Sequence, residues 1–238
     1  MTSLEQIRKL LQESSNTTKR HPATFCKTTP GHYAEHDQFI NVDIPTLRKI
    51  AKDFQDLSLE EIQTFLESPI NQERALALFM LVNHYQKPTT IPKEDVYQFY
   101  LRNLQHVNNW NLVDSSAHLI IGAHIFNTNK DILVTLAQSD NLWKRRIAMI
   151  ATFFFIRKND VAWTFKIAKI LLNDHHDLIH KAVGWMLREA GKRDLAQLLE
   201  FLDEHTAHMP RTMLRYAIEK LDKAQREKYL ALKHTGAL

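Results

Sequence analysis

The chain has 238 residues, of which 44% are hydrophobic and 24% charged, a balance that excludes an intrinsically disordered protein. Its five glycines and seven prolines are few for this length, so long helices are favoured over a β-protein with many turns. It has one cysteine, Cys26, and no signal peptide or run of 18 apolar residues, so we expect a soluble cytoplasmic protein without a disulfide or a membrane span.

Amphipathic helical runs follow one another along almost the whole chain. No segment shows sustained period-2 alternation, so no strand is predicted. Capping residues or prolines mark the helix starts: Ser58 with Glu61 as a capping box, Pro92, Asp140, Asp160, Asp174 and Pro210. Apolar residues at helical spacing predict helices at residues 3–12, 46–55, 60–67, 72–86, 93–105, 111–126, 130–138, 142–157, 161–172, 177–190, 194–204, 211–220 and 223–232.

The segment 21–45 departs from the helical pattern. His21-Pro22, Pro30-Gly31 and Ile44-Pro45 punctuate it, which predicts an irregular connection between the first helix and those that follow. Tyr33 and Phe39 within it either reach toward a ligand or fix the loop to the core.

Similar helical blocks recur at intervals of roughly 30 to 40 residues, which is the period of helical-hairpin repeats. They begin at Arg74, Leu112, Arg146, Lys181 and Arg211. The consensus residues of tetratricopeptide repeats are absent, so we predict an all-α fold of HEAT-like hairpins over residues 1–238, in one domain. Such a solenoid is curved, and the inner helices would line a concave groove suited to an extended ligand such as a DNA duplex.

Trp110 and Asp114 are the most informative pair in the chain. They lie four residues apart in Asn-Asn-Trp-Asn-Leu-Val-Asp (108–114), which places an indole and a carboxylate on one helix face. Further tryptophans, Trp143 and Trp185, accompany basic residues: Lys144, Arg145, Arg146, Arg157, Lys158, Lys181, Arg188, Lys192, Arg193, Arg211 and Arg215. This set suits a site that handles positive charge beside phosphates, although packed tryptophans, a solvated basic face and a helix-start carboxylate would give the same pattern.

Other motifs carry little chemistry. His176 and His180 have the spacing of a helical zinc site, but no third ligand is indicated, and His32 with His36 is a similar incomplete pair. A P-loop, a dinucleotide-binding glycine pattern and a nucleophile elbow are all absent from the sequence. We therefore expect neither a metal nor a cofactor.

Three ordered blocks carry a resemblance to a known family. Asn-Asn-Trp-Asn-Leu-Val-Asp-Ser-Ser-Ala (108–117), Asn-Leu-Trp-Lys-Arg-Arg-Ile-Ala (141–148) and His-Lys-Ala-Val-Gly-Trp-Met-Leu-Arg-Glu (180–189) resemble the AlkD-type DNA alkylation repair enzymes. Residues 39–49 and 209–219 also look familial, so the resemblance covers nearly the whole chain.

The resemblance implies a HEAT-like DNA glycosylase that excises N3- and N7-alkylated purines from duplex DNA without extruding the lesion. Its catalytic Asp matches Asp114, and its two tryptophans match Trp110 and Trp185. Two departures from the founding member are Asn109, in place of tryptophan, and Asn111, in place of aspartate. The DNA-binding residues we expect are Arg146, matched to the family's phosphate-side arginine, together with Arg188, Lys144, Lys181, Trp143 and Tyr33.

The residues themselves also favour this chemistry, independently of the family. Glycosidic hydrolysis usually takes an acid for the leaving group and a carboxylate for the oxocarbenium-like sugar, and here only Asp114 is placed beside an aromatic partner. A cationic alkylated purine leaves as a neutral base without an acid, so one carboxylate could suffice. Two alternatives remain: a non-catalytic module that binds damaged or branched DNA, and a peptide-binding scaffold. For the enzyme we expect alkylated duplex DNA as the partner and a monomer without an obligate protein partner.

Overall fold

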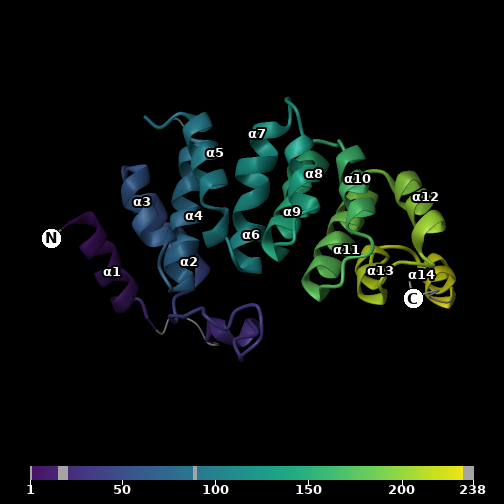
Figure 1. Ribbon diagram of the computed structural model, residues 1–238, viewed down its shortest axis with the longest axis horizontal. Helices are drawn as coiled ribbons and strands as arrows, with labels where there is room; N and C mark the ends of the chain where they lie inside the picture. Colours follow the sequence, from purple (N-terminus) through teal and green to yellow (C-terminus); the bar gives the residue numbers. More distant parts are fainter. Residues whose placement is uncertain (1, 16–20, 88–89, 233–238) are drawn as a thin grey trace. The chain divides into compact units, whose positions relative to one another are not determined.

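The computed structural model describes residues 2–15, 21–87 and 90–232, most of which lie in helices (Figure 1). The one β-type pairing among them is an isolated bridge between Gln38 and Ile70. The predicted all-α class is therefore confirmed, and most helix boundaries differ from the sequence-based ranges by only a few residues. None of the helices described is long and apolar enough to cross a membrane.

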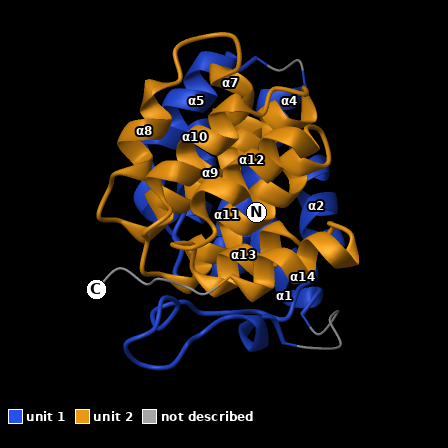
Figure 2. Ribbon diagram, turned by 90° about the vertical axis from the view of Figure 1, so that its right-hand side faces the viewer, with its two compact units in different colours: residues 1–116 blue, residues 117–238 orange. Residues whose placement is uncertain are grey.

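Contacts divide the chain into two compact units, residues 1–116 and 117–238 (Figure 2, blue and orange). Each unit contains helices that pack on their neighbours in the sequence. The single domain expected from the sequence stays a prediction.

Unit 1 is built around one buried helix. Helices α2, α3 and α5 pack on α4, and nearly every α4 residue is buried, including Glu73 and Arg74. The sequence predicted an amphipathic helix over residues 72–86. The predicted polar face is wrong, because neighbouring helices cover α4 on several sides. The helices of this unit are α1 (Ser3–Glu13), η1 (Pro22–Phe25), α2 (Ile44–Asp53), α3 (Leu59–Leu66), α4 (Asn71–Gln86), α5 (Lys93–Arg102), η2 (Leu104–His106) and α6 (Trp110–Ala117), the last of which ends at the boundary between the units.

Unit 2 is a series of helical hairpins, as predicted. Helix α9 packs on α8, α10 and α11, while α11 packs on α9, α10, α12 and α13, so α9, α11 and α13 form one layer and α8, α10 and α12 the other (Figure 1). The helices are η3 (His118–Gly122), α7 (Ala123–Ile125), α8 (Asp131–Ala137), α9 (Leu142–Arg157), α10 (Ala162–Ile170), α11 (Asp177–Gly191), α12 (Leu195–His205), α13 (Arg211–Ala217) and α14 (Lys223–Ala231).

Some helix starts differ from the prediction. The capping box of Ser58 and Glu61 is present, with Ser58 Oγ accepting from the Glu61 amide at 3.2 Å. The caps expected at Asp140, Asp160 and Asp174 are wrong, because the N-cap positions are Asn141, Val161 and His176. Asp174 instead pairs with Arg145 and accepts a hydrogen bond from the His176 amide.

Three further local features bear on packing. The helix expected over 111–126 is interrupted by a π-helical turn, η3, a distortion common near functional sites. Gly184 allows α11 and α13 to approach closely, because a Cβ there would lie 2.4 Å from the Met213 carbonyl oxygen and 2.5 Å from Tyr216 Cβ. The buried stripe of α11 agrees with the sequence pattern: Ile179, Ala182, Val183, Met186, Leu187 and Ala190.

Candidate functional site

Trp110 and Asp114 lie in α6, so their spacing places both on one helix face. Both side chains are half-buried, and the neighbouring Leu112 and Val113 are fully buried. The Asp114 charge also acts on the buried Tyr100 beside it. Burial raises the pKa of Tyr100 well above its usual range, the Ser116 hydrogen bond opposes this rise, and Asp114 adds to it. Asp114 is thus a carboxylate at the edge of the core.

Asn109 fixes the start of α6. Its carbonyl oxygen accepts from the Val113 amide, and its Oδ1 accepts from the Trp110 amide at 2.7 Å. The Asn109 side chain is fully buried, and its Nδ2 donates to Asp37 Oδ2 at 2.7 Å. Cys26 Sγ lies 3.7 Å from the same nitrogen. The segment 21–45 is thereby joined to the residue that precedes Trp110.

Asp37 is the centre of this polar cluster. It forms a buried ion pair with Arg74, whose Nη1 also donates to the Ser68 carbonyl at 2.8 Å. Asn71 Nδ2 donates to Asp37 Oδ2 at 3.1 Å, and Asn71 Oδ1 accepts from Asn111 Nδ2 at 2.7 Å. One carboxylate therefore links the 21–45 segment, α4 and the start of α6.

The Trp110 indole faces the same segment. Burial raises the pKa of the Cys26 thiol, while hydrogen bonds with the Asn109 and Trp110 side chains act against that rise. Trp110 also lines a cavity of about 490 Å³, which we name the Trp110 cavity. Its walls come from Pro22, Phe25, Cys26, Phe39, Val42, Asp43, Ile44, Pro45, Asn71, Gln72, Trp110 and Asn111.

Trp185, the other tryptophan expected at the site, is half-buried on α11. Its ring packs on Phe153 with centroids 5.7 Å apart, and Phe153 packs on His118 at 5.3 Å. Trp185 thus ends an aromatic row that runs over α11, α9 and η3 within unit 2.

The expected DNA-binding residues at the start of α9 differ in exposure. Trp143 and Arg146 are 8% and 5% exposed, and the Arg146 guanidinium donates to the Leu178 carbonyl at the start of α11. Lys144 is half-buried, and its ammonium group makes no ion pair or hydrogen bond with any residue that the structure describes. Lys144 is therefore the cation of this turn that is best placed for a ligand.

Both expected cations of α11 are paired with carboxylates. Lys181 Nζ lies 2.7 Å from Asp177 Oδ2, one helical turn earlier. Arg188 pairs with Glu189 and with Glu219, which follows α13. A phosphate would replace these carboxylates rather than meet free cations.

Tyr33 and the histidines contribute less to the site. Tyr33 is half-buried in the irregular segment and does not line the Trp110 cavity. His176 and His180 are structural: His176 Nδ1 accepts from the Leu178 amide, and His180 Nε2 bonds the Asp174 carbonyl. Within the described ranges no group of three His, Cys, Asp or Glu side chains could hold a metal ion.

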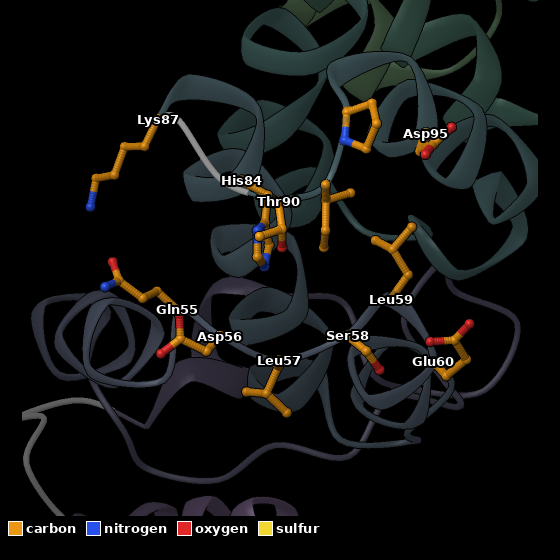
Figure 3. Close-up of a pocket in the computed structure, with 12 residues that line it drawn as sticks. Gln55, Asp56, Leu57, Ser58, Leu59, Glu60, His84, Lys87, Thr90 and Asp95 are labelled. Carbon is orange, nitrogen blue, oxygen red and sulfur yellow. The ribbon is translucent and has the colours of Figure 1, made fainter.

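A second pocket of about 700 Å³ lies elsewhere in unit 1, between the turn that follows α2 and the start of α5 (Figure 3). His84 lies at its wall, with Asp56, Glu60 and Asp95 around the rim. Neither ring nitrogen of His84 makes a hydrogen bond of standard geometry, and both are closed off from solvent. No residue predicted for the site lines this pocket.

No motif in the sequence indicated that Asp37, Asn71 or Arg74 belongs to the site. Asn109 was noted only as a departure from the founding member of the resembling family. A buried amide directly before Trp110 requires hydrogen-bond partners. This requirement is the signal that could have led to Asp37.

Comparison with known proteins agrees with the fold. The chain is similar to a solved structure described as a predicted DNA alkylation repair enzyme from Enterococcus faecalis (TM-score 0.65, 19% identity, 80% of this chain and 92% of that one). It is also similar to AlkD2 from Streptococcus mutans (TM-score 0.60, 14% identity, 93% and 100%) and to smu.31 from Streptococcus mutans UA159 (TM-score 0.58, 14% identity, 93% and 100%). No curated protein matches the sequence. The family model described as DNA alkylation repair enzyme matches residues 7–221, so the chain belongs to the DNA alkylation repair enzyme family.

Proposed function

We propose that the protein is a DNA N-glycosylase that excises cationic N3- and N7-alkylated purines from duplex DNA. The observation that carries the proposal is the pair formed by Trp110 and Asp114 on one face of α6, both partly accessible, in a chain of the DNA alkylation repair family. A carboxylate beside an indole suits a positively charged sugar in the transition state.

The reaction proceeds by hydrolysis of the N-glycosidic bond. The bond between the sugar C1′ and the purine nitrogen breaks, and its electron pair neutralises the cationic base, which leaves without an acid. Water oxygen bonds to C1′, and Asp114 takes up the proton that this water loses. Asp114 also stabilises the developing charge at C1′, and preorganised charge of this kind is worth about 3 to 4 kcal/mol in mutational cases.

The remaining residues hold the DNA. Trp110 and Trp185 would each present a π-face to the cationic sugar, at about 0.5 to 2 kcal/mol per ring. Lys144, Lys181, Arg146 and Arg188 would contact phosphates, with Trp143 and Tyr33 beside them, and such contacts position the duplex without reading its sequence. The resemblance to the AlkD-type enzymes implies that the alkylated base is excised without being extruded from the stack. The enzyme needs no cofactor and acts as a monomer.

The test is release of free base from duplex DNA that carries 7-methylguanine, under single-turnover conditions. The wild type should release base. Asp114→Asn should bind the same DNA but release base at less than one hundredth of the wild-type rate. Trp185→Phe should slow release with little change in DNA affinity. Duplex DNA containing uracil, a neutral base, is the matched substrate control and should remain intact. Release by Asp114→Asn at the wild-type rate would remove this carboxylate from the mechanism, and salt-sensitive binding without any release would identify a DNA-binding module instead.

A further inference from the structure

The Trp110 cavity combines aromatic walls with an exposed apolar rim. Phe25, Phe39 and Trp110 contribute three rings, and Phe25 and Ile44 at the rim are 58% and 45% exposed. Contiguous exposed apolar surface around a hollow often marks a binding site. Its volume of about 490 Å³ lies in the range of small-molecule sites.

The polar groups of this cavity are amides rather than cations. Asn71 and Asn111 exchange a 2.7 Å hydrogen bond at its wall. Gln72 Oε1 accepts from the Ile40 amide at 2.9 Å, which leaves the Gln72 amide nitrogen without a partner among the described residues. Amide groups both donate and accept hydrogen bonds, as do the edges of nucleobases.

Charge excludes an anionic occupant. No Lys or Arg lines the cavity, and its one charged side chain is the Asp43 carboxylate, which accepts from the Thr46 amide at the start of α2. Hydrogen bonds with Thr46 hold the pKa of Asp43 below its usual range, so it stays ionised and repels phosphate. The occupant that fits is a flat, uncharged ring with polar edges.

We propose that the Trp110 cavity binds a single unstacked nucleobase of the DNA. The inference rests on the proposed function in taking DNA as the ligand, and adds a base-binding subsite to it. Aromatic rings stack on any base, so this subsite would recognise the unpaired state rather than a sequence. Asp114 does not line the cavity, so the base held there is not the one whose glycosidic bond is hydrolysed beside Asp114. An unpaired neighbour, or the base opposite the lesion, would enter it.

The experiment compares affinities for three lesion-free duplexes by fluorescence anisotropy at one salt concentration. One duplex is fully paired, one carries a single bulged adenosine, and one carries the same bulge as an abasic tetrahydrofuran residue. The abasic bulge retains the distorted backbone and lacks the base. The wild type should bind the adenosine bulge about tenfold more tightly than the abasic bulge, as expected for one stacked base.

Variants connect this ratio to the cavity. Phe25→Ala should bring it close to one, and because Phe25 is exposed, the variant should keep the wild-type thermal midpoint. Leu195→Ala is the matched control, since Leu195 is 46% exposed and does not line the cavity, and it should retain the full ratio. Equal wild-type affinity for the two bulges, or a full ratio in Phe25→Ala, would overturn the proposal. These duplexes contain no lesion, so a protein without glycosylase activity can still pass the test, and an active glycosylase can fail it.

Discussion

Asp37 and Asn109 are separated by 72 residues, and Asn109 Nδ2 donates a 2.7 Å hydrogen bond to Asp37 Oδ2. The same asparagine accepts from the Trp110 amide through its Oδ1. The position of Trp110 therefore depends on a carboxylate in a segment that contains little regular structure. Asp37 is also paired with the buried Arg74, so one ion pair holds both the 21–45 segment and the start of α6 in place.

Asp37→Asn should destabilise the protein by about 3 kcal/mol or more, since it leaves the buried Arg74 guanidinium without a counter-charge. Urea unfolding followed by far-UV circular dichroism measures the change. Asp43→Asn is a suitable comparison, because asparagine caps a helix about as well as aspartate, so this N-cap substitution near the surface should cost less than about 0.5 kcal/mol. Equal effects of the two substitutions would contradict a central role for Asp37.

Helical periodicity was sufficient to predict the all-α fold, because helices such as α11 and α12 bury one stripe against their neighbours. Ile179, Val183 and Met186 illustrate this, since they are buried where their spacing in the sequence predicts. The Asp37 cluster could not be predicted in this way. Its members lie on a loop, on α4 and before α6. Hydrogen bonds between residues so far apart in the chain produce no periodic pattern in the sequence. Buried Arg74 is an example, because an arginine in a helical sequence normally indicates an exposed face.

Gly184→Ala should destabilise the protein by about 1 to 3 kcal/mol, although alanine is the better helix former. The new Cβ would lie 2.4 Å from the Met213 carbonyl oxygen, and that backbone atom can move only if α13 moves. Gly191→Ala is the control within the same helix. Its Cβ would meet Leu198 Cδ2, the end of a flexible side chain, which can rotate away. The thermal midpoint of Gly184→Ala should therefore lie well below those of Gly191→Ala and the wild type. The opposite order would show that α11 and α13 do not approach as closely as the contacts at Gly184 indicate.

Three histidines that are buried or half-buried predict a loss of stability in mild acid. Burial lowers the pKa values of His84, His176 and His205 from an ordinary value of 6.5. In mild acid these histidines therefore bind more protons in the unfolded chain than in the folded chain. The contribution of the neutral histidines to the free energy of unfolding is fully present above about pH 6.5. It is lost as the pH falls from there through the pKa values of the folded state. His84→Gln should make this decline shallower without abolishing it, because the other two histidines remain. Urea unfolding at a series of pH values measures the slope, and an unchanged slope in the variant would show that His84 is protonated as readily in the fold as in the unfolded chain.

Lys144→Ala should weaken DNA binding and reduce the slope of log K against log salt by about one, as expected for the loss of one phosphate contact. Lys144 is the appropriate residue because its ammonium group has no partner in the described part of the chain, whereas Arg146 bonds the Leu178 carbonyl. Arg146→Ala should therefore lower stability as well as affinity, and its binding must be compared at equal folded concentration. Lys169→Ala, which removes an exposed lysine paired with Glu204, is the control and should leave the slope unchanged. If Lys169→Ala reduced the slope as much as Lys144→Ala, binding would depend on net charge alone, and the start of α9 would have no special place in the DNA contact.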